Sequence, residues 1–172
     1  MVYTYTTRSA EETEALGRRI GEWLLRGGVR RAFLSLYGEM GVGKTALTRG
    51  FAAALGIAGV KSPTYTMVNE HRSPDGSRSL FHFDLYRIES EDDLWSIGFE
   101  DYLKRDGFCV TEWSENAPAA LPPDRLVLRI DRTADGEDCR RITLLAPDDF
   151  PCGPAAAFPA EEEKGASGAA VR

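Results

Sequence analysis

Residues 38–45 form the motif that most restricts how this chain can fold. They are Gly38, Glu39, Met40, Gly41, Val42, Gly43, Lys44 and Thr45, and they match the phosphate-binding pattern G-x-x-x-x-G-K-[ST]. An apolar run at 32–37 precedes them and predicts a buried strand. Residues 46–55 follow with apolar side chains one helical turn apart, which predicts a helix that ends at Gly56. The chain therefore has a strand, a glycine-rich loop and a helix in the order that phosphate binding requires.

The loop predicts binding of a nucleotide together with Mg²⁺. Its glycines allow backbone N–H groups to turn toward phosphate oxygens, and the start of the following helix adds a partial positive charge. Lys44 can reach the β- and γ-phosphates, and the hydroxyl of Thr45 can ligate Mg²⁺. The alternative is a glycine-rich turn with a surface lysine, but the predicted strand and helix on either side favour nucleotide binding.

The composition indicates a single acidic domain in a reducing compartment. The chain has 172 residues and a formal net charge of −6, so we do not expect a strongly basic surface for non-specific nucleic-acid binding. Any contact with RNA would need a local patch or a partner protein. Cys109, Cys139 and Cys152 lack metal-ligand spacing and cannot all pair, which indicates a reducing cytosol with buried or idle thiols. Because we find no run that could span a bilayer and no signal peptide, the expected location is the cytoplasm, without membrane contact.

The remaining pattern predicts a mixed sheet with helices on both faces. Ser9 and Glu12 match a capping box that begins a helix ending at Gly27. A short helix is expected at 90–97, and the expected strands are 2–6, 32–37, 65–71, 79–86, 107–113, 125–132 and 140–146. Strands 65–71 and 79–86 should pair as an antiparallel hairpin, and the last two strands should do the same. The predicted class is α/β, a P-loop NTPase-like sheet in a three-layer α/β/α arrangement, with the phosphate loop at the carboxyl end of a central strand.

The domain is expected to span residues 1–150. Beyond it, residues 151–172 are rich in Ala, Gly, Pro and Glu and offer little apolar surface to bury. We therefore expect a disordered tail and assign it no function.

Two acidic residues on predicted strands are candidates for the metal site. Strand alternation places His82, Asp84 and Tyr86 on one face. An aspartate among apolar neighbours is costly to bury without a cation, which could be Mg²⁺, a lysine or an arginine such as Arg87. Glu112 ends an apolar strand, which is the Walker B position. Either carboxylate could touch the metal or its water, or could form a structural salt bridge.

For each of three further residues, the sequence allows two interpretations. His82 is catalytic or, as is more common for a histidine in a strand, packed or hydrogen-bonded. Trp113 belongs to the core or closes over the nucleotide. Thr64, which follows the break made by Ser62 and Pro63, is an ordinary loop residue or a switch threonine that senses the γ-phosphate.

Four motifs together resemble the TsaE (YjeE) family. They are the loop at 38–45, Ser62-Pro63-Thr64-Tyr65, His82-Phe83-Asp84-Leu85-Tyr86-Arg87 and Glu112-Trp113, and the resemblance runs from about Ser9 to Ala146. The family consists of small bacterial P-loop ATPases of threonylcarbamoyladenosine synthesis on tRNA. Glu39-Met40 stands where the family commonly has Asp-Leu, which changes a loop side chain but not the backbone cradle.

The resemblance implies a role for each motif residue. The phosphates and Mg²⁺ would be bound by Lys44 and Thr45, the switch-like loop would be 62–64, and the metal and the hydrolytic water would be served by Asp84 and Glu112. Trp113 would lie near the nucleotide, and the segment from Ser9 to Thr13 would approach the adenine.

The resemblance also implies a reaction and a partner. Members of the family bind a two-subunit threonylcarbamoyl transferase complex of TsaB- and TsaD-type proteins, and they hydrolyse Mg-ATP to support its turnover. The modified nucleotide is the adenosine beside the anticodon in tRNAs that read codons starting with A, and the tRNA would be reached indirectly through the complex. Because no arginine finger can be assigned from the sequence, we predict slow hydrolysis by the chain alone and faster hydrolysis with the complex.

Other classes of nucleotide-binding protein fit the sequence less well. A small-molecule kinase would add an arginine-rich lid after the phosphate loop, and no long segment of that kind follows Ala46. A GTPase would carry Asn-Lys-x-Asp, but Asn69 precedes Glu70 and Asn116 precedes Ala117. A nucleotide-gated binding module with incidental hydrolysis remains open, because it would use the same loop.

Overall fold

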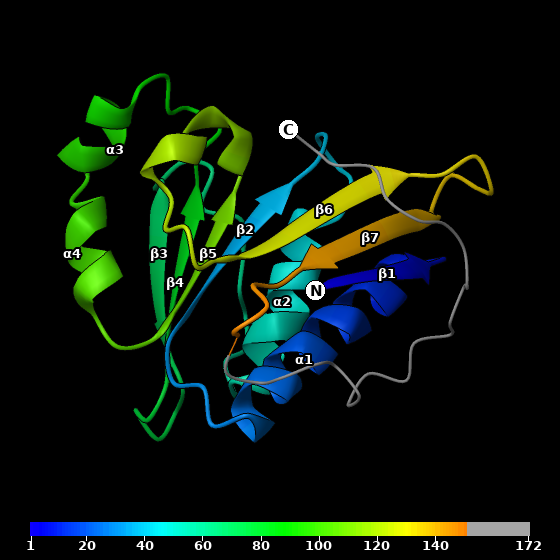
Figure 1. Ribbon diagram of the computed structural model, residues 1–172, viewed down its shortest axis with the longest axis horizontal. Coiled ribbons are helices and arrows are strands. Elements are labelled where there is room, and N and C mark those ends of the chain that lie inside the picture. Colours follow the sequence, from blue (N-terminus) through cyan, green and yellow to red (C-terminus); the bar gives the residue numbers. More distant parts are fainter. Residues whose placement is uncertain (151–172) are drawn as a thin grey trace.

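Seven strands form one mixed sheet, and helices cover both of its faces (Figure 1). This computed structural model describes residues 1–150, so the tail expected at 151–172 lies outside the described residues. The strands are β1 (Val2–Thr7), β2 (Ala32–Tyr37), β3 (Val68–Arg72), β4 (Ser79–Asp84), β5 (Phe108–Glu112), β6 (Leu126–Arg132) and β7 (Arg140–Leu145). The helices are α1 (Ala10–Arg26), α2 (Lys44–Ala54), α3 (Glu91–Ser96) and α4 (Phe99–Lys104), with 3₁₀ turns η1 (Ser114–Asn116) and η2 (Pro118–Ala120).

The order of the strands places the phosphate loop near the middle of the sheet. The order is β1-β7-β6-β2-β5-β4-β3. Strand β2 runs parallel to β5 and β6, and β5 also runs parallel to β4. Both predicted hairpins are confirmed, because β3 pairs with β4 and β6 with β7 in antiparallel fashion. The carboxyl ends of β2, β4 and β5 therefore meet at one edge of the sheet, where parallel sheets bind their ligands.

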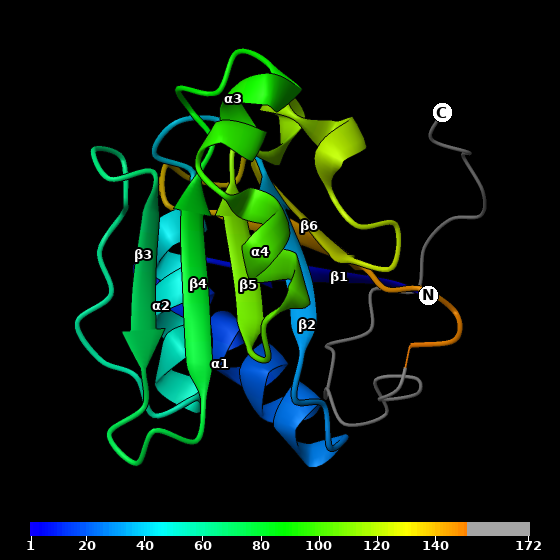
Figure 2. The ribbon, with the colours of Figure 1, turned by 90° about the vertical axis from the view of Figure 1, so that its left-hand side faces the viewer.

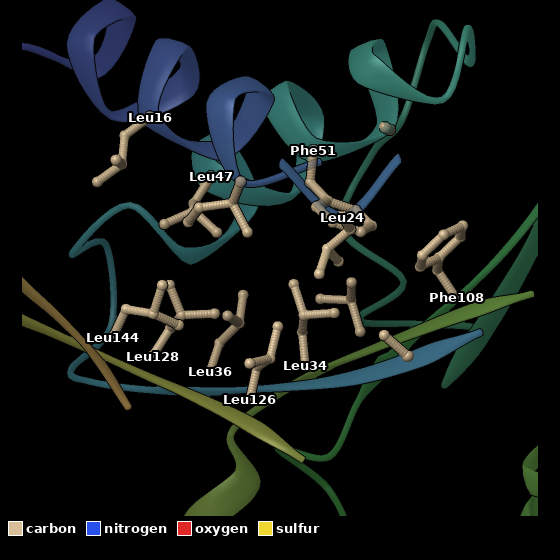
Figure 3. Close-up of a cluster of buried hydrophobic side chains, with 14 of the residues drawn as sticks. Leu16, Leu24, Leu34, Leu36, Leu47, Phe51, Phe108, Leu126, Leu128 and Leu144 are labelled. Atoms are coloured by element: carbon tan, nitrogen blue, oxygen red, sulfur yellow. The ribbon is translucent and has the colours of Figure 1, made fainter. Parts of the chain in front are cut away.

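Helices α1 and α2 pack side by side against one face of the sheet (Figure 1). Figure 3 shows their apolar side chains above those of the strands, and the labelled residues are Leu16, Leu24, Leu34, Leu36, Leu47, Phe51, Phe108, Leu126, Leu128 and Leu144. Phe51 is fully buried, and the burial of one such side chain contributes about 1.5–3 kcal/mol. The two helices approach closely at Gly50, where an added Cβ would overlap the carbonyl oxygen of Glu14.

Helices α3 and α4 cover the opposite face, which confirms the three-layer α/β/α prediction (Figure 2). Phe83 of β4 lies beneath them, and its ring centroid is 5.1 Å from that of Phe99 and 5.1 Å from that of Tyr102. Helix α4 was not predicted from the sequence. It begins after Gly98 without a side-chain cap, whereas α3, which also has six residues, begins with a capping box at Ser90.

Two predicted strands are shorter than expected, because the chain turns at the edge of the sheet where β2, β4 and β5 end. We call this edge the functional edge. The strand expected from Tyr65 begins at Val68, since the N–H groups of Thr66 and Met67 both donate to the carbonyl of Pro63, at 3.1 and 2.8 Å. Strand β4 ends at Asp84, because its carboxylate accepts the backbone N–H of Tyr86 at 2.9 Å and turns the chain.

The cysteines behave as the sequence predicts where the structure describes them. Cys109 and Cys139 are free thiols. Burial raises the pKa of the Cys109 thiol to about 12, which makes it unreactive at neutral pH. Cys152 lies outside the described residues. Within residues 1–150, none of the helices has the length and apolar character needed to cross a bilayer.

Candidate nucleotide-binding site

The phosphate loop connects β2 to α2 at the functional edge of the sheet. Gly38 adopts φ +142°, and a Cβ at this position would overlap the carbonyl oxygen of Ile130 on β6. Only glycine therefore lets the loop leave β2 this close to its neighbour. Helix α2 begins at Lys44, directly after Gly43, so its N-terminal backbone amides and partial positive charge belong to the loop.

Two arginines of the β6–β7 hairpin contact the outside of this loop. Arg140 is buried, and its Nε donates to the carbonyl oxygen of Val42 at 2.8 Å. Arg132 is exposed, and its Nη2 lies 3.5 Å from the carbonyl oxygen of Met40. Neither residue was predicted from the sequence. No local signal could have found Arg140, because 98 positions separate it from Val42 and only the strand order brings the two together.

Lys44 is folded back against its own loop. Its ammonium group donates to the carbonyl oxygens of Gly38 and Glu39, the latter at 2.9 Å. It also lies 3.8 Å from the centre of the Trp113 ring, which is a cation–π geometry. Burial lowers the pKa of Lys44, and the negative charges of Glu112, Glu115 and Asp84 oppose this shift. The structure thus places Lys44 and Trp113 together, as the sequence analysis expects for residues near one ligand.

Thr45 and Glu112 meet at the centre of the site. The Thr45 hydroxyl lies 3.0 and 3.1 Å from the two carboxylate oxygens of Glu112. Glu112 is only 3% exposed. Its Oε1 is also 2.8 Å from Nε2 of His82, a fully buried residue on β4. The predicted Walker B carboxylate therefore lies beside the predicted Mg²⁺ hydroxyl.

Asp84 holds the switch-like loop rather than a positively charged side chain. Its Oδ2 accepts the hydroxyl of Thr64 at 2.9 Å and that of Ser62 at 3.3 Å. The arginine considered from sequence lies elsewhere, since the Arg87 guanidinium is 5.4 Å from the centre of the Tyr65 ring. Asp84 and Glu112 are direct neighbours in the β4–β5 register. One carboxylate is thus tied to the phosphate loop and the other to residues 62–64.

A pair of aromatic side chains lies beside Lys44 of the loop. The rings of Tyr86 and Trp113 are 5.0 Å apart. Trp113 has φ +57°, a strained left-handed conformation for a bulky residue that turns the chain directly after Glu112. Tyr65 is 87% exposed and Met40 is 65% exposed. Trp113 is thus partly buried, packed against the apolar cluster beneath α3 and α4 and beside Lys44, and its closing over a nucleotide remains a prediction.

The oxygen donors at this edge suit Mg²⁺. They are the hydroxyl of Thr45 and the carboxylates of Glu112 and Asp84, and hard oxygen ligands are those that Mg²⁺ prefers. Among the described residues, no cluster of three or more His, Cys, Asp or Glu side chains could hold a metal unaided. Mg²⁺ in nucleotide sites usually takes one or two protein carboxylates and completes its shell with phosphates and water, so the donor set fits a metal that arrives with a nucleotide.

The start of α1 also adjoins the loop. Thr13 packs beside Gly43, since a Cβ on this glycine would lie 3.5 Å from the Thr13 methyl group. The Thr13 hydroxyl is 2.8 Å from that of Thr7, which fixes the side chain. The proposed contact of residues 9–13 with adenine remains a prediction.

Comparison with known proteins identifies the family. Residues 7–142 match the family model described as "Threonylcarbamoyl adenosine biosynthesis protein TsaE". A protein of Haemophilus influenzae named tRNA threonylcarbamoyladenosine biosynthesis protein TsaE is 39% identical over 132 residues, covering 76% of this chain and 80% of that protein. The Bacillus subtilis protein of the same name is 38% identical over 143 residues, covering 83% of this chain and 84% of that protein.

A solved structure agrees with the sequence relatives. The crystal structure of Bacillus subtilis YdiB matches with a TM-score of 0.67 and 31% sequence identity, and the match covers 85% of this chain and 86% of that chain. The residues that match the family model, 7–142, include the phosphate loop, the residues around Asp84 and the end of β5. The chain belongs to the TsaE family.

Proposed function

We propose that this protein is the ATPase of threonylcarbamoyladenosine modification of tRNA and that it hydrolyses Mg-ATP at residues 38–45. The contact between Thr45 and Glu112 carries the proposal, because it joins the end of the phosphate loop to the carboxylate at the end of the neighbouring parallel strand. In P-loop NTPases such a hydroxyl and carboxylate hold Mg²⁺ together. The names of the relatives support the place of the reaction in tRNA modification.

Lys44 would exchange its contacts within the protein for contacts with phosphate. The carbonyl oxygens of Gly38 and Glu39 and the ring of Trp113 are all uncharged partners, whereas a phosphate oxygen offers a charge-assisted bond. A phosphate would also oppose the effect of burial on the pKa of Lys44, because a nearby negative charge favours the ammonium form. The ammonium group of Lys44 would then lie where negative charge develops during phosphoryl transfer.

The two carboxylates would perform different tasks. Glu112 and Thr45 would hold the metal, while Asp84 would position the switch-like loop through Thr64. When bound, Mg²⁺ supplies positive charge that stabilises the phosphate oxygens in the transition state. The division agrees with the contacts of the two acids. They are neighbours in the β4–β5 register, but Glu112 is hydrogen-bonded to Thr45 and Asp84 to Thr64.

The reaction would be attack of water on the γ-phosphorus of ATP. The bond from phosphorus to the water oxygen forms, the bond to the β–γ bridging oxygen breaks, and ADP and inorganic phosphate leave. Glu112 would orient this water with the carboxylate oxygen that His82 does not contact. The arginine finger, which cannot be assigned in this sequence, would come from the partner. Hydrolysis would therefore be slow for the chain alone and faster in the complex.

The proposed partner is the two-subunit transferase complex of TsaB- and TsaD-type proteins. The net charge of −6 agrees with tRNA being held by the partners rather than by this chain. Because the proposed function is part of tRNA modification, the expected location remains the cytoplasm.

A pull-down combined with phosphate release tests the proposal. Tagged protein is incubated with the two transferase subunits and ATP, ADP or no nucleotide, and the captured subunits and the released phosphate are measured. We expect capture that depends on the nucleotide and phosphate release that the complex stimulates. Lys44→Ala should abolish both, while Lys104→Ala, on the exposed surface of α4, should change neither. Equal phosphate release by Lys44→Ala and the unchanged protein would refute the site.

The same assay separates the alternative functions. If Glu112→Ala binds ATP, releases no phosphate and still supports repeated modification of tRNA, the chain is a nucleotide-gated binding module. A small-molecule kinase would form ADP without free inorganic phosphate when its acceptor is present. Either result would replace the ATPase proposal.

A further inference from the structure

His82 lies in the interior of the protein, directly behind the proposed metal carboxylate. It is 0% exposed and sits in the middle of β4, two positions before Asp84. Its Nε2 is 2.8 Å from Oε1 of Glu112. The neighbouring residues on β4, Phe81 and Phe83, point to the opposite face and pack among apolar side chains. His82 therefore belongs to the face of the sheet that carries the site.

In the part of the chain that the structure describes, this imidazole makes its polar contact with one residue, Glu112. A carboxylate accepts hydrogen bonds, so the nitrogen that faces Glu112 is the one that carries a proton. The other ring nitrogen, Nδ1, is buried and has no hydrogen-bond partner among the described residues. A buried histidine kept for stability normally satisfies both nitrogens. Within residues 1–150 only Nε2 is paired, so the bond with Glu112 is the polar contact that could give this buried imidazole a role.

The two oxygens of Glu112 are not equivalent. Among residues 1–150, Oε1 contacts both His82 and Thr45, whereas Oε2 contacts Thr45 alone. If Thr45 turns its oxygen to a metal, its single hydroxyl proton can serve only one carboxylate oxygen. The bond from His82 would then anchor Oε1 and leave Oε2 directed into the site.

We propose that His82 is a positioning residue, whose Nε2–H holds the Glu112 carboxylate in the orientation needed for hydrolysis. This inference rests on the proposed ATPase function, and it adds a residue that acts through Glu112 without touching the nucleotide. Groups that orient a metal-site carboxylate from behind typically change metal affinity or activity by about 10- to 100-fold when removed.

Two amide substitutions provide a matched test. In His82→Gln the amide nitrogen can occupy the place of Nε2 and still donate to Glu112. In His82→Asn the shorter side chain places its amide near the position of Nδ1, out of reach of Glu112. We expect His82→Asn to lower kcat for ATP about 10- to 100-fold with KM changed less than about threefold, and His82→Gln to recover most of that loss. Equal kcat values for the two variants would overturn the proposal.

A structural role would give a different result. If His82 acts through Glu112 rather than through the stability of the fold, the melting temperature of His82→Asn should stay close to that of the unchanged protein. In a Glu112→Gln background, His82→Asn should cause no further loss of activity, since the two residues act as one unit. A large fall in melting temperature that parallels the loss of activity in both His82 variants would show that His82 serves stability alone.

Nuclear magnetic resonance of the imidazoles gives a readout that does not depend on ATP. The chain has two histidines, His71 and His82, so a His71→Gln variant assigns both signals. We expect His82 to carry its proton on Nε2, with a signal that shifts in Glu112→Gln. A His82 ring with a bare Nε2 would overturn the proposal even if the protein hydrolyses ATP. If the unchanged protein hydrolyses no ATP, the proposed function fails while this spectrum still decides whether His82 donates to Glu112.

Discussion

Thr45 and Glu112 are separated by 67 positions in the chain, yet the Thr45 hydroxyl lies 3.0 Å and 3.1 Å from the two carboxylate oxygens of Glu112. The pairing of β2 with β5 produces this contact, because it places the end of the β5 strand beside the loop that follows β2. Under the proposed function, the buried carboxylate and the hydroxyl would together hold the metal that joins the protein to a nucleotide.

Replacing the Thr45 hydroxyl should impair the reaction while leaving the fold intact. We expect Thr45→Val, which has nearly the same shape, to lower hydrolysis about 10- to 100-fold and to raise the Mg²⁺ concentration needed for half-maximal activity. Thr45→Ser keeps the hydroxyl and should retain most of the activity. Phosphate release measured over a Mg²⁺ titration checks this. Normal activity in Thr45→Val would remove the hydroxyl from the proposed metal site.

Arg140 should support the shape of the phosphate loop. Its Nε donates to the carbonyl of Val42 from a buried position, so Arg140→Met leaves that carbonyl without its partner. We expect weaker ATP binding by about 10-fold, since a lost hydrogen bond to a charged group costs about 1.5–3 kcal/mol. The adjacent Arg141 is exposed, and Arg141→Met is the matched control. Calorimetric titration with ATP measures both variants, and equal affinities would contradict the prediction.

The close contact of α1 with α2 should tolerate no side chain at Gly50. A methyl group there would overlap the carbonyl oxygen of Glu14, so Gly50→Ala must separate the helices. We expect a loss of stability of about 1–3 kcal/mol or more, although alanine favours a helix intrinsically. Ala53→Gly, on the exposed side of α2, should cost only about 1 kcal/mol. Urea unfolding compares the two, and a smaller loss for Gly50→Ala would show that the helices are not in tight contact.

Glu70 should contribute to stability in a way that depends on pH. Hydrogen bonds from Arg105 and Tyr102 lower the pKa of Glu70 from 4.5 to about 2. A carboxyl group whose pKa is lower in the folded protein stabilises the fold above its unfolded pKa, and this contribution disappears as pH falls through the folded value. Because the side chains of Arg105 and Glu70 are 38% and 46% exposed, solvent screening limits the contribution to about 1 kcal/mol.

Denaturation at several pH values measures that contribution. The stability difference between the unchanged protein and Glu70→Gln should be constant above about pH 5 and should shrink toward zero near pH 2. Glu100→Gln is the control, because Glu100 is exposed on α4 and forms no salt bridge within residues 1–150. A stability difference that persists unchanged at pH 2 would exclude the bond to Arg105 as its source.

The sequence predicted the elements whose signals are local. The loop at 38–45 follows directly from its glycines, Lys44 and Thr45, and both hairpins follow from alternation around their turns. Helix α4 was missed because it follows Gly98 without a side-chain cap, whereas α3, which has the same length, begins with the capping box at Ser90. Strand ends near Met67 and Asp84 were wrong by a few residues, because hydrogen bonds from the turns replace the strand pairing there.

The sequence by itself determined that a phosphate loop lies between a strand and a helix and that acids lie on two further strands, because each of these features depends on neighbouring residues. Only the tertiary structure decided which acid serves which loop. Glu112 reaches Thr45 and His82 because β5 lies between β2 and β4, whereas Asp84, one strand farther from the loop, reaches Thr64. The order of the strands sets these contacts, and it depends on how the whole sheet buries its two faces.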